Sequence, residues 1–417
     1  MLMFRTLLVY IICFFGIYAA VLFFISFFDN KNMKTFNASR PEYEKLPLIS
    51  LIIPVFNGEK ALRKTILNAL HLEYPKDKIE IIVVDDGSTD KSYKIAESFA
   101  KQGIKACRLG ENLGKGAALN LGIKRSSGQL IANLDADSFL DRDALLKMAG
   151  FFENPHVMAV TPSVKIWGPK NIVQKIQFVE FLSTAIVRKV FSYLGGVPII
   201  SGASTLFRKD FFEKHGGFLE NTLTEDVEMS LRIENKGYIT ESAMDVSVYT
   251  CGALTFRIFF SQRLRWFKGL IDSLMIHRDL FRPSKGNVAV MILPLSLLAI
   301  VLAMTATAYA LVKFTQIAAQ NFINFYLVGF DMSQWFDINF DVYSIDVGAT
   351  MILPLVLILF SIILIYLCRK YSNERQRIVE PYLLFILSYW LIAAMCWASA
   401  LIYKIAGKKI RWGNRHI

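Results

Sequence analysis

The sequence predicts an α/β domain with a mixed, mostly parallel sheet, joined to transmembrane and interfacial helices. Between residues 48 and 134, short apolar runs rich in β-branched residues alternate with stretches of helical periodicity, which is typical of a parallel sheet covered on both faces. Four nearly uncharged stretches also occur, at residues 4–28, 288–312, 347–367 and 382–403. Each can supply the ~20 apolar residues that a helix needs to cross a bilayer.

The overall composition agrees with this division. Of the 417 residues, 54% are hydrophobic and 20% are charged, so apolar and charged residues are segregated along the chain. The net charge of +12 is concentrated near membrane boundaries, for example at Arg369 and Lys370. Anionic lipid headgroups and an anionic nucleotide explain this charge more simply than a nucleic acid does. The five cysteines form no C-x-x-C pair, which argues against a cysteine-bound metal.

The first apolar stretch reads as an uncleaved membrane anchor, since its apolar core is long and no small-x-small cleavage site follows it. Lys31, Lys34 and Arg40 follow the stretch, whereas Arg5 precedes it. Because basic residues favour the cytoplasmic side, this bias predicts that the C-terminal side of the anchor, and with it the α/β domain, lies in the cytoplasm. Together with the other apolar stretches, we expect a multi-pass protein of the plasma membrane.

Three polar clusters follow the apolar runs that we expect to be strands, and they begin at Asn57, Asp85 and Asp135. Ligands of open α/β sheets bind beyond the carboxyl ends of the strands. Asp135 and Asp137 are two positions apart, so both carboxylates can face one ion. Mg²⁺ and Mn²⁺ favour such oxygen ligands together with substrate phosphates. We therefore expect a divalent cation that neutralises a diphosphate leaving group.

The second cluster places Asp85 and Asp86 at a strand end, where they can hydrogen-bond a nucleoside. Ser88 can cap the following helix, and both interpretations can hold at once. Residues 112–117 resemble a phosphate loop but lack the G-x-x-x-x-G-K-[ST] pattern. Lys115 can still meet a diphosphate there, next to the N–H groups of a helix start.

A candidate general base lies in the run Thr224-Glu225-Asp226. Thr224 is a suitable N-cap, and acidic residues in the first turn suit the helix dipole without any catalytic role. A base that deprotonates a sugar hydroxyl is also expected to be a carboxylate near the diphosphate. Asp226 is our candidate for that base.

Two amphipathic, aromatic-rich stretches are expected to be interfacial helices, at residues 172–194 and 255–281. Gln262 and Trp266 are four residues apart and share a helix face, with Arg265 beside them. This second stretch is therefore expected to serve the site as well as the membrane surface. The cations of the first stretch are Lys175, Arg188 and Lys189.

Six motifs occur in order along residues 46–282. They are Pro54-Val55-Phe56-Asn57-Gly58-Glu59, Val84-Asp85-Asp86-Gly87-Ser88, Asp135-Ala136-Asp137, Ser201-Gly202 to Arg208, Thr224-Glu225-Asp226 and Gln262-x-x-Arg265-Trp266. Together they resemble the processive family-two glycosyltransferases, a group that includes the poly-N-acetylglucosamine, hyaluronan and cellulose synthases. The resemblance extends more loosely to the membrane segments that follow, and it implies a GT-A-type fold.

The resemblance also implies a role for each residue. The nucleotide-sugar would be bound by Pro54, Val55, Asn57, Glu59, Asp85, Asp86, Lys115, Asp135 and Arg265. Asp137 would carry the metal, and Asp226 would be the general base. Gln262, Trp266 and Glu225 would bind the acceptor. The acceptor hydroxyl would then attack the anomeric carbon directly as UDP leaves, with inversion and without an enzyme nucleophile.

The basic tail from Lys409 to Arg415 resembles the gating segment of hyaluronan synthases, with Asn414 where that family has threonine. Trp412 and Arg415 would be its gating residues, and a basic membrane anchor is the alternative interpretation. A cytoplasmic tail requires that residues 382–403 do not cross the membrane. We therefore expect that stretch to be a re-entrant hairpin or to lie in the interface.

The domain organisation expected from these features has four parts. They are an N-terminal anchor and linker (1–45), a cytoplasmic glycosyltransferase domain (46–254), an interfacial helix with the QxxRW motif (255–285) and a C-terminal transmembrane region with a basic cytoplasmic tail (286–417).

Two alternatives to a polysaccharide polymerase fit the sequence less well. A non-processive transferase that moves one sugar onto a polyisoprenyl phosphate shares the D-x-D chemistry but generally lacks QxxRW. A transporter would carry ionisable residues inside its spans, and here they are nearly absent. The resemblance suggests UDP-N-acetylglucosamine as donor and a polysaccharide as acceptor. Because so few spans form a thin-walled conduit, we also expect a small membrane subunit or a homo-oligomer.

Overall fold

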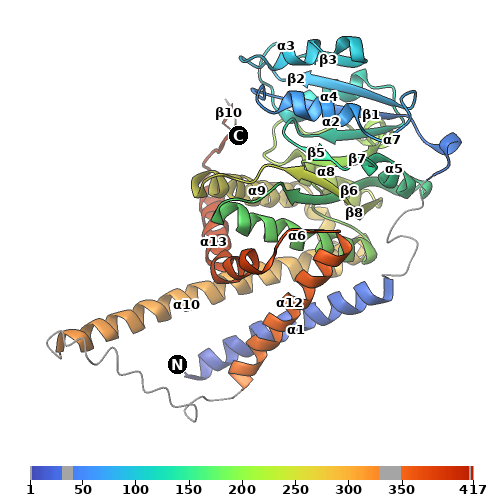
Figure 1. Cartoon of the computed structure of the whole chain (residues 1–417). Helices are drawn as coiled ribbons and strands as arrows, with labels where there is room; N and C mark the ends of the chain where they lie inside the picture. Colours follow the sequence, from blue (N-terminus) through green and yellow to red (C-terminus); the bar gives the residue numbers. More distant parts are fainter. Residues whose placement is uncertain (1, 31–40, 328–348, 413–414, 417) are drawn as a thin grey trace.

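The computed structural model describes residues 2–30, 41–327, 349–412 and 415–416 (Figure 1). An eight-stranded sheet forms the centre of the α/β domain, with the strand order β3-β2-β1-β4-β7-β6-β8-β5. Its strands are β1 (Ile49–Val55), β2 (Ile79–Asp85), β3 (Ile104–Arg108), β4 (Leu130–Leu134), β5 (Phe139–Leu140), β6 (Val157–Ile166), β7 (Ser204–Arg208) and β8 (Ile239–Thr250). Strands β3, β2, β1 and β4 are mutually parallel, whereas β7 is antiparallel to both β4 and β6. The predicted mixed, mostly parallel sheet is confirmed.

Strand β1 is central because it is apolar on both faces. All seven of its residues are buried, as expected for a parallel strand that is covered on both sides. Leu51 and Ile53 pack into one hydrophobic cluster, and Ile52 packs into a second cluster. Alternate residues thus face opposite sides of the sheet.

Short helices cover the sheet and connect its strands. They are α2 (Leu62–Leu70), α3 (Ser92–Glu97), α4 (Lys115–Arg125), α5 (Ala144–Ala149), α7 (Lys209–His215) and α8 (Glu225–Asn235). Val55 at the end of β1 pairs with Asp85 at the end of β2, and β4 runs parallel beside β1. The three polar clusters that follow these strands therefore meet at one edge of the sheet.

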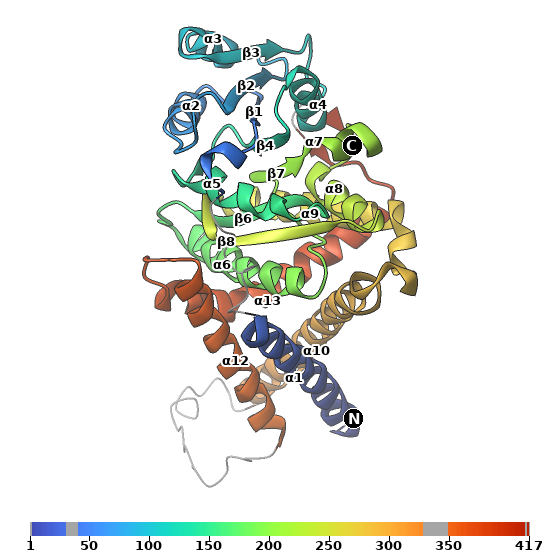
Figure 2. The same ribbon diagram turned by 90° about the vertical axis from the view of Figure 1, so that its right-hand side faces the viewer.

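Four helices in the described part of the chain are long and apolar enough to cross a membrane. Three of them extend away from the α/β domain, and the N-terminus lies at the far end of this group (Figure 2). These three are α1 (Leu2–Asn30), α10 (Leu293–Leu327) and α12 (Ala349–Tyr371).

The fourth apolar helix, α13 (Val379–Ile405), packs against α6 (Ile172–Tyr193) and α9 (Phe256–Ile276). Near its start, Glu380 pairs with Lys175 of α6 at 2.6 Å. Near its end, Lys404 pairs with Asp272 of α9 at 2.5 Å. Both ends of α13 thus contact helices next to the α/β domain, and the chain continues from α13 on the domain's side. The stretch is one continuous helix, so the hairpin that we considered is wrong.

Candidate active site

Asp85, at the end of β2, is fully buried. Its Oδ2 accepts a hydrogen bond from Ser88 N at 3.2 Å and pairs with Arg108 Nε at 3.0 Å. Its Oδ1 is buried without a hydrogen-bond partner among the described residues. Because buried polar atoms are nearly always hydrogen-bonded, this oxygen suits an N–H donor of a ligand, such as a nucleobase.

Asp86 lies beside Asp85 but faces the next loop. Its carboxylate accepts hydrogen bonds from Leu113 N and Gly114 N, both at 2.8 Å. Gly87 has a φ of +70°, and a Cβ there would lie 2.5 Å from the backbone of Glu111, so this close approach requires glycine. Asp86 therefore fixes the loop that leads into α4.

The residues that follow β1 make hydrogen bonds at the same edge of the sheet. Asn57 has a φ of 49°, and its Oδ1 accepts a hydrogen bond from Thr89 N at 2.9 Å. Glu59 Oε2 accepts one from Lys91 N at 3.1 Å. Val55 O accepts one from Asp86 N at 2.8 Å, and Pro54 is buried in the strand before it. These bonds hold the β1 and β2 loops together.

Lys115, the first residue of α4, joins three parts of the site. Its Nζ lies 2.5 Å from Asp135 Oδ1 and 3.4 Å from Glu225 Oε1, and it donates to Gly202 O at 2.8 Å. Burial alone would lower the pKa of Lys115, but the charges of Asp135, Glu225 and Asp226 outweigh burial and raise it. The lysine is therefore a fixed cation between the β4 end and α8.

Asp137 lies just beyond the end of β4; the residue is exposed overall, although its carboxyl group is partly buried. Partial burial, followed by the charge of Asp135, raises the pKa of its carboxyl. No group of three or more His, Cys, Asp or Glu side chains that could hold a metal occurs among the described residues. Two neighbouring carboxylates still fit Mg²⁺ or Mn²⁺, because such ions take only one or two carboxylates when phosphates supply further ligands.

Asp226 lies in the first turn of α8, opposite Lys115. Burial and then the charge of Glu225 raise the pKa of Asp226 to about 6, although Lys115 opposes the shift. A Cβ at Gly202 would lie 2.5 Å from Asp226 Oδ2, so the Gly202 backbone closely approaches the Asp226 carboxylate. Arg265 of α9 donates to Leu223 O at 2.8 Å, just before α8.

Thr224 is the N-cap residue of α8, as predicted, but its side chain makes no capping hydrogen bond. Its Oγ1 is buried and finds no partner within the described chain. A Cβ at Gly269 would lie 2.4 Å from this oxygen, so α9 packs closely against the threonine. The expectation of a side-chain cap was wrong because helix packing decides the position of this hydroxyl.

Trp266 and Gln262 lie on α9 and face α6. The Trp266 ring stacks on Phe181 with centroids 6.1 Å apart and an interplanar angle of 23°. Gln262 Oε1 accepts hydrogen bonds from Gln177 at 2.9 Å and from Arg263 at 3.0 Å. This arrangement gives a fixed aromatic surface close to Arg265 and the start of α8.

The ion pair that supports this surface was not predicted from the sequence. Arg263 is 1% exposed and makes two hydrogen bonds with Glu180 of α6. Its guanidinium lies 4.2 Å from the centre of the Trp266 ring and 4.4 Å from that of Phe259. Tyr389 of α13 donates to Glu180 Oε1 at 2.7 Å. The group therefore joins α6, α9 and α13.

The proposed gating residues lie at the end of the chain. The backbone of Trp412 belongs to β9 (Arg411–Trp412) and that of Arg415 to β10 (Arg415–His416). Their side chains lie outside the described part of the structure, so the gating role stays a prediction.

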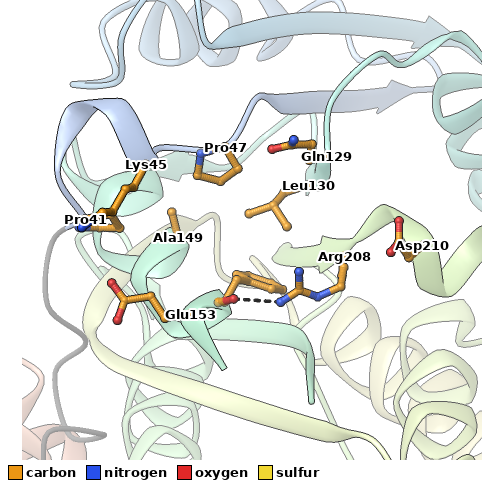
Figure 3. Close-up of a pocket in the computed structure, with 10 residues that line it drawn as sticks. Pro41, Lys45, Pro47, Gln129, Leu130, Ala149, Glu153, Arg208 and Asp210 are labelled. Carbon is orange, nitrogen blue, oxygen red and sulfur yellow. Dashed lines mark hydrogen bonds between the residues drawn. The ribbon is translucent and has the colours of Figure 1, made fainter. Parts of the chain in front are cut away.

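One cavity of ≈ 570 Å³ lies away from the predicted site (Figure 3). Its lining includes Pro47, which precedes β1, and Gln129 and Leu130 at the start of β4. These residues mark the amino-terminal edge of the parallel strands, opposite Asp85 and Asp135. The cavity is therefore separate from the predicted nucleotide-sugar site.

Comparisons with known proteins agree with this arrangement. Residues 50–216 match the model of glycosyl transferase family 2. A poly-beta-1,6-N-acetyl-D-glucosamine synthase from Staphylococcus epidermidis is 32% identical over 242 residues, which are 57% of this chain and 58% of that protein. The same synthase from Staphylococcus aureus strain COL is 32% identical over 248 residues, 58% of each chain. The matches thus span less than two thirds of these relatives.

A solved structure with the same fold is the mannosyltransferase from Pyrobaculum calidifontis in complex with GDP-Man and Mn²⁺. It is 18% identical with a TM-score of 0.61, and the match covers 96% of this chain and 100% of that one. Residues 50–216 therefore form a domain that matches glycosyl transferase family 2, and the fold of the chain is that of a GT-A-type enzyme. Over more than half of its length the chain is similar to poly-N-acetylglucosamine synthases, so the predicted resemblance and the predicted fold are confirmed.

Proposed function

We propose that this protein transfers N-acetylglucosamine from UDP-N-acetylglucosamine to the end of a growing polysaccharide, with inversion, at the cytoplasmic face of the plasma membrane. The observation that carries the proposal is the position of Asp226. Its carboxylate faces the cation Lys115 across the edge of the sheet, and Trp266 of the packed helix α9 supplies an aromatic surface nearby. The names of the relatives support the choice of sugar.

The donor would lie along the strand ends. Asp85 would accept a hydrogen bond from the uracil, while Asp86, Asn57 and Glu59 hold the loops around it. Lys115 and Arg265 would face the diphosphate. Asp137, together with Asp135, would hold Mg²⁺ or Mn²⁺, which supplies positive charge to the diphosphate when bound.

The acceptor sugar would stack on Trp266, with Gln262 and Glu225 beside it. Asp226 would then take the proton from the attacking hydroxyl. The hydroxyl oxygen forms a bond to the anomeric carbon as the bond from that carbon to the UDP oxygen breaks. One displacement inverts the configuration, so the step needs a base and no covalent intermediate.

Export of the product would use the membrane helices. Helices α6 and α13 lie between the sheet domain and the group α1, α10 and α12 (Figure 2), and α9 packs against α13. Three helices that extend away from the domain would form only a thin-walled conduit for the product. We therefore propose that a small membrane subunit or a second copy of this chain completes it. A single purified chain in lipid that both polymerises and translocates would contradict this part.

The pH profile tests the base. Asp226 acts deprotonated, and its pKa is raised to about 6. The groups that face it are Glu225, Lys115, Arg265 and Arg188. We expect kcat/KM to be constant above this pKa and to fall about tenfold per pH unit below it. Transfer rates measured from pH 5 to pH 8 check this, and a rate that does not change across pH 6 contradicts the assignment.

The function itself is tested by incorporation of radiolabel with purified protein in lipid. Each UDP-sugar is offered with Mg²⁺, with Mn²⁺ or with EDTA, beside an Asp226→Asn control. We expect a polydisperse, high-mass product from UDP-N-acetylglucosamine that requires the metal and is absent from the control. A single-sugar product extractable into organic solvent would instead establish a lipid-linked transferase.

A further inference from the structure

Arg188 lies on the face of α6 that supports the acceptor surface. Positions 177, 181, 184 and 188 are three or four residues apart, so they share one side of the helix. Two of these residues contact the QxxRW helix, since Gln177 donates to Gln262 at 2.9 Å and Phe181 stacks on Trp266. Arg188 continues the same row toward the C-terminal end of α6.

That end of the row lies next to the base. Arg188 Nε donates to Ile199 O at 3.0 Å, and this segment continues to Gly202, whose backbone closely approaches Asp226. Burial lowers the pKa of Arg188 to about 10, and the charge of Asp226 opposes that shift. The guanidinium is therefore a cation at neutral pH, within electrostatic reach of the Asp226 carboxylate.

Arg188 also keeps an unused donor. Its Nη1 is buried and has no hydrogen-bond partner within the ranges that the structure describes, while the side chain as a whole is partly exposed. An unmade hydrogen bond of a buried charged group costs more free energy than that of a neutral group. A planar guanidinium with spare N–H groups suits a ligand that presents several oxygen atoms close together.

The acceptor is such a ligand. Its attacking hydroxyl must come within about 3 Å of Asp226, and its ring lies on Trp266 in the proposed function. A sugar held at both points would lie along the α6 row and would present its other oxygen atoms to Arg188. The phosphate of a lipid acceptor would offer the same kind of oxygen atoms.

We propose that Arg188 is an acceptor-binding residue, whose guanidinium donates hydrogen bonds to oxygen atoms of the terminal acceptor group and so orients the attacking hydroxyl toward Asp226. This inference rests on the proposed function for the nature of the acceptor. It assigns the charged end of α6 to the site, whereas composition alone assigns that helix to the membrane interface.

The test separates acceptor from donor kinetics with the full chain in lipid. Arg188→Gln and Arg188→Lys are compared with the wild type, using N-acetylglucosamine oligosaccharides as acceptor and UDP-N-acetylglucosamine as donor. Lys175→Gln is the matched control, because Lys175 is a cation of the same helix that pairs instead with Glu380. The rate at which the enzyme slowly hydrolyses UDP-N-acetylglucosamine in the absence of acceptor measures donor binding and activation alone.

We expect Arg188→Gln to raise the acceptor KM about 10- to 100-fold, because this is the loss in affinity that follows when a hydrogen bond from a charged group is removed. The donor KM and donor hydrolysis should stay unchanged, and Arg188→Lys should recover part of the effect. An unchanged acceptor KM, or equal losses for donor hydrolysis and transfer in a variant that melts at the wild-type temperature, overturns the proposal.

A failure of the proposed function gives a different result from a failure of the Arg188 assignment. In that case the wild type itself does not extend the oligosaccharides. If the wild type instead glycosylates a polyisoprenyl phosphate, the KM for that phosphate decides the role of Arg188 by the same criteria.

Discussion

Replacing Asp226 with asparagine is expected to lower kcat for sugar transfer by about 10²- to 10⁴-fold, the range for loss of a general base. Asparagine keeps the size of the side chain but cannot accept the proton of the attacking hydroxyl. Lys115 would keep its contacts with Asp135 and Glu225, so the donor side should stay intact. Initial rates with saturating donor and acceptor measure the effect, and titration with UDP checks that nucleotide binding is retained.

Asp279→Asn is a suitable control for this prediction. Asp279 is an exposed carboxylate beyond α9 that pairs with Arg282 at 2.9 Å. The Asp279→Asn substitution should leave the rate of sugar transfer unchanged. The remaining activity of Asp226→Asn should also lose the fall in rate near pH 6 that the wild type shows. If the variant keeps both the wild-type rate and that fall, a different residue is the base.

The sheet, and the meeting of the proposed donor-binding residues at one edge of it, could be predicted from the sequence because their signals are local. Short β-branched runs end directly before Asn57, Asp85 and Asp135, and parallel strands bring such ends to one edge. The sequence also singled out Lys115, which the structure places against Asp135. It did not show that Asp86 binds the backbone of the loop before α4, since this contact spans 27 residues and leaves no periodic signal.

The contacts around the proposed acceptor surface were harder to predict because they join distant helices. Glu180 and Arg263 are 83 residues apart, and each belongs to a stretch whose composition is equally typical of a membrane-surface helix. The position of α13 was hard to predict for the same reason, since it also depends on contacts with distant helices. Its length and hydropathy fit a membrane span, whereas the partners of Glu380 and Lys404 at its two ends hold it beside α6 and α9. Hydropathy does not encode those partners.

The second prediction concerns the ion pair beneath Trp266. We expect Arg263→Met to lower the free energy of unfolding by about 3–5 kcal/mol, because it leaves the largely buried Glu180 carboxylate, 11% exposed, without its cation. Methionine fills similar volume, so the loss reflects charge more than packing. Arg263→Lys should recover little, because an ammonium cannot replace two parallel hydrogen bonds and a stacked guanidinium. Thermal or denaturant unfolding of the purified protein in detergent measures these changes.

A double variant separates stability from function. Glu180→Leu combined with Arg263→Met removes both charges, and apolar replacement of a buried ion pair is often neutral for stability. We therefore expect the double variant to regain most of the stability, particularly when Tyr389→Phe removes the hydroxyl that donates to Glu180. If the double variant stays as unstable as Arg263→Met, the unpaired charge is not the cause of the instability.

Acceptor binding should stay impaired even when stability returns, because Gln262 has lost the hydrogen bond from Arg263 and Trp266 has lost the guanidinium packed on its ring. Recovery of stability without recovery of the acceptor KM would assign the pair to alignment of the acceptor surface as well as to folding.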